Sequence, residues 1–232
     1  MSNKYSNFLT ILLVLIIIAI IAIMGFLGFK YYQTYVSKNE AEDFVDTYFG
    51  NNQNQNNENN TSVIPPDDDD DENMFEGVEE GTNNNTGGNS SSNAPKYNGF
   101  LTAGSIEIPT TSLKCPIIAR SEYSEKALNT SVVELYGPGL NQVGNTTISG
   151  HNYRNGKFFS NNKKLNIGDK IYITDLTGKR LSYTIYNKYE TDENDDEYMT
   201  RDTNGAREIS LSTCTDDSKA RLVIWAKADL DA

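Results

Sequence analysis

The stretch from Phe8 to Phe29 reads FLTILLVLIIIAIIAIMGFLGF, 22 residues without a charged side chain. A helix of that length, at ~1.5 Å per residue, crosses a hydrocarbon core of ~30 Å. A secretory signal peptide has a shorter apolar region and a small-residue cleavage site, which Met24 and Phe26 disfavour. A buried core helix would normally keep a polar stripe. The sequence therefore predicts an uncleaved single-pass anchor over residues 8–29, preceded by a short N-terminal segment, residues 1–7.

Charge does not orient this anchor. Lys4 and the terminal amine precede the apolar run, whereas Lys30 and Lys38 follow it. The positive-inside rule therefore favours neither direction.

The segment after the anchor carries most of the acidity of the chain. Residues 39–95 hold 14 Asp or Glu and no Lys or Arg, within a formal net charge of −12 for the whole chain. Runs such as NNQNQNNENN and PPDDDDDE lack the apolar side chains needed to offset the entropy of ordering. We expect residues 30–96 to form a disordered Asn/Asp-rich stalk, with a binding tail for a cationic partner as the alternative. No basic patch indicates a nucleic-acid partner.

Strand-like patterns begin near Asn98. The run from Lys170 to Glu190 predicts a hairpin with Thr177 and Gly178 at the turn. Further strands are predicted over 104–118, before Gly150, and over 207–213 and 220–228, and a helix only over 121–129. Several short strands with turn signals predict an all-β barrel or sandwich over residues 97–232.

Three residues of this domain suggest nucleophilic chemistry. Cys214 ends one predicted strand, Arg221 begins the next, and His151, the one histidine of the chain, follows Gly150 at the end of another. A thiol with an ordinary pKa of ~8.5 needs a nearby cation to favour its thiolate, and His151 and Arg221 are the candidates.

Each residue also has a structural interpretation. An isolated cysteine is usually a small buried hydrophobe, and two cysteines outside a cell can form a disulfide. Cys115 lies inside an apolar strand pattern, so we expect it in the core. His151 alone could be a structural residue and Arg221 a surface charge; only their combination with Cys214 favours catalysis.

These residues carry a resemblance to the sortases, the cysteine transpeptidases of Gram-positive cell surfaces. The family's nucleophile motif T-L-x-T-C is similar to S-L-S-T-C, which ends at Cys214, and GNTTISGH resembles the segment that leads to the family's catalytic histidine. GSIEIP, CPII and FFSNNKKLNIGDKIYI resemble other sortase segments, and Arg221 matches the third catalytic position. The resemblance covers about Tyr97 to Asp229.

The resemblance implies a closed eight-stranded β-barrel with short helices. It also implies that the barrel lies outside the cell and that the N-terminus, residues 1–7, lies in the cytoplasm. It implies that a C-terminal sorting signal of the L-P-x-T-G type is cleaved through a thioester. The secreted protein is then joined to an amine of the cell wall or to a pilin lysine. Cys214 would be the nucleophile, His151 the acid and base, and Arg221 the oxyanion and substrate contact, with Ser212 and Thr213 as further substrate-binding positions.

The subfamily is not set by these motifs. A separation of 63 residues between His151 and Cys214 leaves little room for the extra helix of the haem-protein-anchoring sortases, although GHNYRNGKFF resembles that group.

A metal is not required by this chemistry, and we expect no cofactor. Six of the eight residues in ETDENDDE are acidic, however, and some sortases are activated by calcium. A solvated acidic loop is the favoured interpretation, since the run lacks the spacing of a calcium-binding helix–loop–helix. The candidate Ca²⁺ ligands would be Glu190, Asp192, Asp195 and Glu197.

Two other functions fit parts of the sequence. A cell-wall cysteine peptidase or amidase would use the same Cys and His, although papain-like wall hydrolases place Cys before His. A non-catalytic surface-binding module would share the anchor, the stalk and the β-domain.

Overall fold

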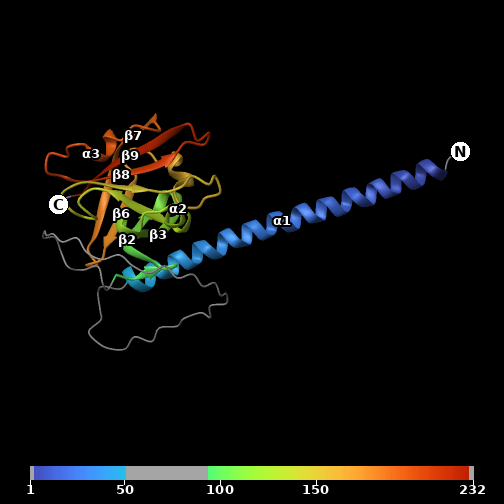
Figure 1. The fold of residues 1–232 in the computed structure, drawn as a ribbon, viewed down its shortest axis with the longest axis horizontal. Coiled ribbons are helices and arrows are strands. Elements are labelled where there is room, and N and C mark those ends of the chain that lie inside the picture. Colours follow the sequence, from blue (N-terminus) through green and yellow to red (C-terminus); the bar gives the residue numbers. More distant parts are fainter. Residues whose placement is uncertain (1–2, 51–93, 230–232) are drawn as a thin grey trace, which may run out of the picture.

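The computed structural model describes residues 3–50 and 94–229. A long helix, α1 (Asn3–Phe49), leads to a β-barrel at its C-terminal end (Figure 1). Most of the predicted acidic stalk, residues 51–93, lies outside the described residues.

The barrel is closed by eight strands in the order β2-β3-β4-β5-β8-β9-β7-β6, because β6 pairs back onto β2. The short strand β1 adds to β2 outside this ring. The predicted all-β fold with a closed eight-stranded barrel is confirmed. The strands are β1 (Lys96–Tyr97), β2 (Phe100–Ile108), β3 (Leu113–Ile118), β4 (Val132–Tyr136), β5 (Gly144–Ser149), β6 (Lys170–Asp175), β7 (Arg180–Asp192), β8 (Arg207–Cys214) and β9 (Ala220–Ala228).

Short helices occupy the connections between strands. They are η1 (Pro109–Thr111), η2 (Arg120–Glu122), α2 (Glu125–Thr130), η3 (Phe159–Lys164) and α3 (Glu197–Thr200). The Ser124 hydroxyl accepts a hydrogen bond from the N–H of Ala127 and caps α2. The helix predicted over 121–129 is thus present as η2 followed by α2.

Alternating side chains fill the barrel, as the period of a strand requires. In the β6–β7 hairpin Ile171 pairs with Tyr183 and Ile173 with Leu181. Asp175 accepts from the backbone N–H groups of Thr177 and Lys179 and so fixes the turn. The fully buried core residues include Ile106, Ile108, Ile117, Ile148, Phe159, Leu165, Ile171, Ile173, Ile185, Ile209, Leu211 and Ile224.

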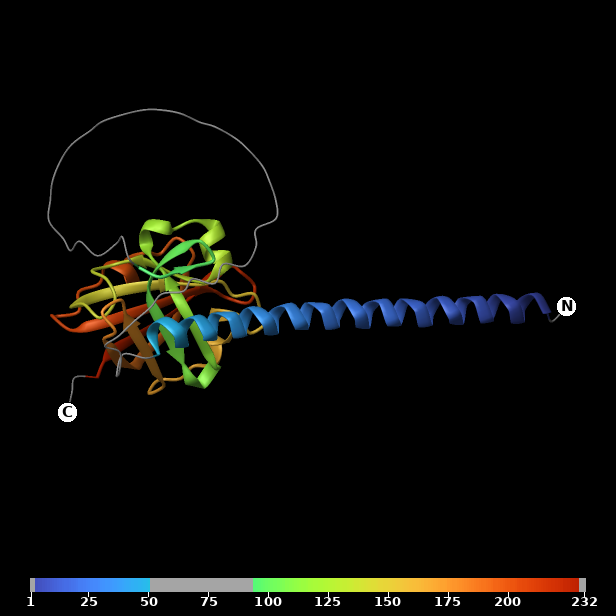
Figure 2. The same ribbon diagram turned by 90° about the horizontal axis from the view of Figure 1, so that it is seen from below.

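The helix α1 corrects the predicted start of the stalk. Residues 30–49, which we expected to lack regular structure, continue α1 and lie along the barrel (Figures 1 and 2). Ala41 packs against the barrel core, Val45 is buried where α1 meets β3, and the rings of Phe44 and Tyr97 lie 5.1 Å apart. A Lys114–Asp46 ion pair also joins β3 to α1. The last part of α1 is therefore a component of the folded domain.

The first part of α1 has no contact with the barrel. It is long and apolar enough to cross a membrane, and no residue of its most apolar window is buried. The predicted anchor thus forms one continuous helix with the segment that packs on the barrel.

Candidate active site

Three adjacent strands bring the predicted catalytic residues together. β5 and β8 are parallel, with Ser149 opposite Ser212, and β8 and β9 are antiparallel, with Cys214 opposite Arg221. His151 and Cys214 each lie two residues beyond the Ser149–Ser212 pair. They therefore leave the barrel at the same end.

The end of β5 packs closely against its neighbours at Gly150. A Cβ atom at this position would lie 2.8 Å from Val132 Cγ1 and 3.0 Å from Phe159 Cδ2. A larger residue would displace the strand end that carries His151.

Arg221 contacts the candidate nucleophile directly. Its Nη1 donates to Cys214 Sγ at 3.1 Å, and both side chains are partly exposed. A fixed cation beside sulfur stabilises a thiolate relative to a thiol. Of the two cations that the sequence offers as partners for this thiol, Arg221 is the one that contacts it.

His151 is half-buried beside this pair. Its ring centroid lies 5.0 Å from that of Tyr153. Burial lowers the pKa of His151 from its ordinary value; Glu125 opposes this effect, and the Arg221 guanidinium adds to it. His151 Nε2 is buried and bonds no protein group that the structure describes.

Asn152 links the histidine loop to the cysteine strand, and the sequence analysis missed it. Its Nδ2 donates to the carbonyl oxygen of Cys214 and to Asp216 Oδ1, each at 3.0 Å. Its Oδ1 accepts from the N–H of Arg154 at 3.1 Å. Only its place directly after the histidine could have drawn attention to it.

Cys115 has no part in this site. It is 3% exposed within the barrel core, as predicted, and burial raises the pKa of its thiol to about 12. Cys115 and Cys214 are both free thiols, so the disulfide alternative is excluded in this structure.

The comparison with known families supports the resemblance in the sequence. A family model described as Sortase domain matches residues 106–229, more than half of the 232-residue chain. The chain belongs to the sortase family.

Individual sortases match over part of their length. Sortase A of Bacillus anthracis is 31% identical over 124 residues, which are 52% of this chain and 57% of that protein. The structure of sortase A from Corynebacterium diphtheriae is 28% identical with a TM-score of 0.51, over 57% of this chain and 63% of that one. Sortase D5 of Clostridium perfringens is 25% identical with a TM-score of 0.50, over 56% and 80%. These relatives belong to different sortase classes, so the subfamily stays open.

Two predicted substrate-binding positions of the sortase are buried. Ser212 and Thr213 are each 2% exposed. The hydroxyl of Ser212 lies 3.0 Å from that of Tyr198, and Thr213 Oγ1 has no hydrogen-bond partner among the described residues. Substrate contact by these two residues stays a prediction.

The connection between β7 and β8 covers the outer face of β8 next to Cys214. Arg201 of this connection pairs with Glu208, donates to Asn145 Oδ1 at 3.0 Å, and lies 4.5 Å above the Trp225 ring. Tyr198 precedes it and is also buried. These contacts hold the connection between β7 and β8 in place against β8 and β9.

The acidic run uses several carboxylates for its own turn. Asp192 accepts from the N–H of Asn194, and Asp195 accepts from the N–H of Glu197 and from the Thr191 hydroxyl. Across residues 3–50 and 94–229, no three His, Cys, Asp or Glu side chains are grouped to hold a metal ion. A solvated acidic loop without a cofactor stays the prediction, with calcium activation as the alternative.

Proposed function

We propose that the protein is a membrane-anchored transpeptidase that cleaves the C-terminal sorting signal of secreted proteins, of the L-P-x-T-G type. It would transfer the protein to an amine of the cell wall or to a pilin lysine. The observation that carries this proposal is the 3.1 Å contact from Arg221 to the sulfur of Cys214, with His151 at the end of the strand beside it. Membership of the sortase family supports it.

Cys214 acts first. As a thiolate it attacks the carbonyl carbon of the scissile peptide bond and forms a thioester when the amine leaves. This divides one difficult amide exchange into two easier steps.

His151 moves the protons. As an imidazolium it donates to the departing amine, and as neutral imidazole it takes a proton from the incoming amine. The half-buried ring beside Arg221 has a lowered pKa, so the base form is readily available near neutral pH.

Arg221 stabilises charge at both stages. Its guanidinium faces the thiolate before attack and can donate to the oxyanion that forms at the carbonyl. Such a donor raises the rate to the extent that its bond strengthens in the transition state.

The location follows from the same chemistry. A transpeptidase for secreted proteins meets its substrate outside the cell, so α1 would place its N-terminus inside and the barrel outside. The apolar part of α1 supports membrane attachment.

The test offers full-length protein in detergent a set of fluorescent sorting peptides together with an amine acceptor. We expect ligated product from the wild type and from Cys115→Ala, and none from Cys214→Ala. Arg221→Met should lower the rate by about 10²- to 10³-fold. Cleavage without ligation would favour a peptidase or amidase, and no turnover of any peptide would favour a binding module.

A further inference from the structure

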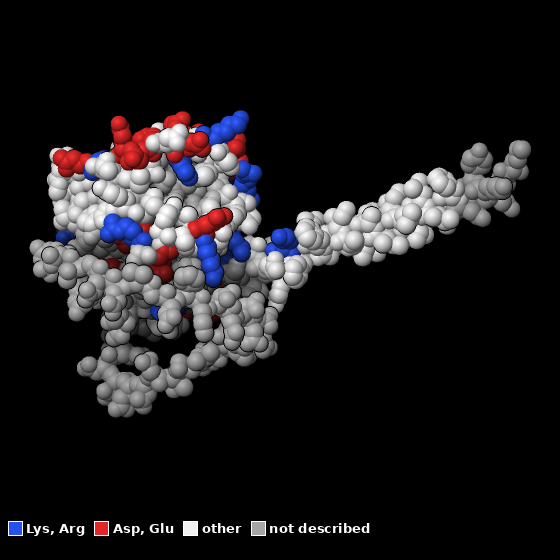
Figure 3. Space-filling model, in the orientation of Figure 1, with Lys and Arg blue, Asp and Glu red and all other residues white. Residues whose placement is uncertain are grey.

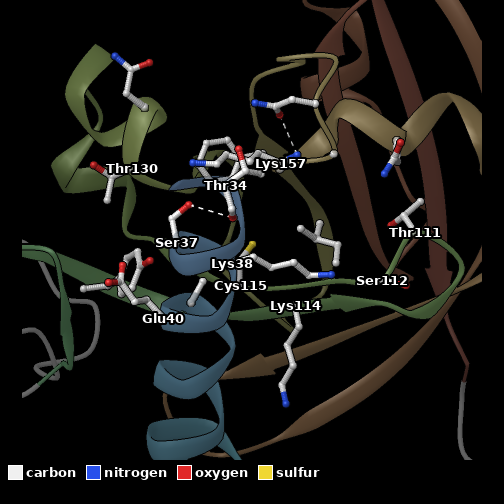
Figure 4. A pocket seen from close by; sticks show the side chains of 18 of the residues that line it. Thr34, Ser37, Lys38, Glu40, Thr111, Ser112, Lys114, Cys115, Thr130 and Lys157 are labelled. Carbon is white, nitrogen blue, oxygen red and sulfur yellow. Dashed lines mark hydrogen bonds between the residues drawn. The ribbon is translucent and has the colours of Figure 1, made fainter. Parts of the chain in front are cut away.

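A cavity of about 430 Å³ lies between α1 and the barrel. α1, the start of β3, the end of α2 and the loop 152–158 between β5 and η3 form its walls (Figure 4). The lining includes Thr34, Ser37, Ala41, Leu113, Asn129 and Lys157.

The cavity lies where the side of α1 that faces the barrel changes from apolar to polar side chains. Ala41 and Val45 pack against the barrel, whereas Ser37 and Thr34, nearer the anchor, line the open space with small polar side chains. Their hydroxyls donate to helix carbonyls, Thr34 to Lys30 and Ser37 to Thr34. The helix therefore leaves a polar gap at the end nearer the apolar span.

In a bilayer spanned by residues 8–29, this end of the cavity would lie at the level of the lipid headgroups. Thr34 is five residues beyond Phe29, or about 8 Å along the helix. The headgroup layer extends about 5–8 Å beyond the hydrocarbon core. Tyr31, Tyr32 and Tyr35, at the same level, are 77%, 64% and 57% exposed, as is usual for aromatic side chains at a membrane interface.

The charged side chains of the lining are three lysines, Lys38, Lys114 and Lys157, and one carboxylate, Glu40. Lys114 is paired with Asp46, and Lys38 with Glu42 at 3.6 Å. The ammonium group of Lys157 has no ion pair or hydrogen bond among the described residues.

The surroundings of Lys157 are also suited to a membrane surface. Figure 4 shows Lys157 with Thr34 at the same end of the cavity. Tyr153 and Arg154 of the same loop are exposed. In Figure 3, Lys and Arg side chains (blue) lie along the edge of the barrel that is next to the apolar part of α1. Aromatic and cationic side chains together are typical of surfaces that contact anionic lipids.

We propose that this cavity binds the headgroup of an anionic phospholipid from the bilayer that α1 spans, with Lys157 as its main contact. The lipid would hold the loop 152–158, which follows His151, against the membrane surface. The site does not depend on the catalytic proposal, because it needs only the anchor and the docked helix.

The test uses the full chain in nanodiscs of phosphatidylcholine alone or mixed with phosphatidylglycerol. The protein is then released from the nanodiscs in the mass spectrometer, and native mass spectrometry counts the lipids that stay bound to it. We expect retained phosphatidylglycerol but little phosphatidylcholine, and about five-fold less retention in Lys157→Gln, the effect of one lysine at an anionic surface. Ser37→Trp should also abolish lipid retention, because the indole ring would fill the cavity although all lysines remain in place.

Lys179→Gln is the matched control, since Lys179 is an exposed lysine in the β6–β7 turn and does not line the cavity. It should retain lipid as the wild type does. Equal retention of both lipids, or wild-type retention by Lys157→Gln, would overturn the proposal. Wild-type retention by Ser37→Trp would assign lipid binding to surface lysines and also overturn it. Melting curves establish that each variant is folded.

Discussion

The side-chain amide of Asn152 donates to the carbonyl oxygen of Cys214 at 3.0 Å, in the place where a backbone N–H would bond in a longer strand. The N–H of Gly150 already donates to the Ser212 oxygen at 3.2 Å. In a continued parallel ladder the N–H of residue 152 would donate next to residue 214. Because the side chain takes over this bond, the backbone is free to turn at His151 while the two strand ends stay joined.

Replacing Asn152 by alanine should therefore affect catalysis more than stability. We expect kcat to fall by about ten- to hundred-fold, because His151 and Cys214 lose their fixed separation. KM should change little. Steady-state ligation assays measure both constants.

Asn155→Ala is the matched control for this variant. Asn155 caps a turn in the same loop by accepting from the N–H of Lys157 at 3.0 Å, and among the described residues its side chain forms no hydrogen bond to β8. Both variants should lose similar stability. Equal losses of kcat in the two would contradict a positioning role for Asn152.

The environment of His151 can be measured directly, because it is the one histidine of the chain. NMR titration should give a pKa below the ordinary value of about 6.5. Arg221→Met should raise this pKa, since a cation that disfavours the imidazolium is removed. Glu125→Gln should lower it further, because a carboxylate that favours the imidazolium is lost. Arg154→Met, a control in the same loop, should leave it unchanged; an unchanged pKa in Arg221→Met would mean that Arg221 does not face the ring.

The barrel was predictable because its signals are local. Alternation in the 170–190 hairpin, the turn at Gly178 and the strand that ends at Cys214 each depend on neighbouring residues. The Cys214–Arg221 contact was predictable for the same reason, since two consecutive strands bring these residues together.

The docking of α1 was not predicted, because it joins residues more than sixty positions apart, such as Asp46 and Lys114. The acidic, Asn-rich composition of residues 39–95 as a whole conceals the helical spacing of Ala41, Phe44 and Val45. Asn152 was missed because asparagine in a loop has many roles. Its bond to Cys214 exists only once β5 and β8 are paired.

The two thiols should differ in reactivity. Iodoacetamide should add once to the native protein, at Cys214, and twice after denaturation, because Cys115 is buried with a pKa of about 12. Intact mass measures the number of adducts. Native Cys115→Ala should still take one adduct and native Cys214→Ala none. An adduct on native Cys214→Ala would show that the core opens.

Calcium should not alter the melting temperature of the full chain. Asp192 and Asp195 already accept hydrogen bonds within their own turn, and a bound ion would have to replace these bonds. A calcium titration followed by thermal melting measures this, with magnesium as the control cation. A calcium-specific rise in melting temperature would instead support a site at Glu190–Glu197.

The docked part of α1 should contribute to the stability of the barrel. Val45 is 5% exposed where α1 meets β3, and Val45→Ala should cost about 1–3 kcal/mol of unfolding free energy through lost packing. Asp43, two residues away, is exposed, and Asp43→Ala should stay within about 0.5 kcal/mol of the wild type. Denaturant unfolding of the full chain in detergent, followed by the fluorescence of the single Trp225, measures both. If the two variants unfold alike, the docked part of α1 does not stabilise the barrel, and the barrel would then move independently of the apolar part of the helix.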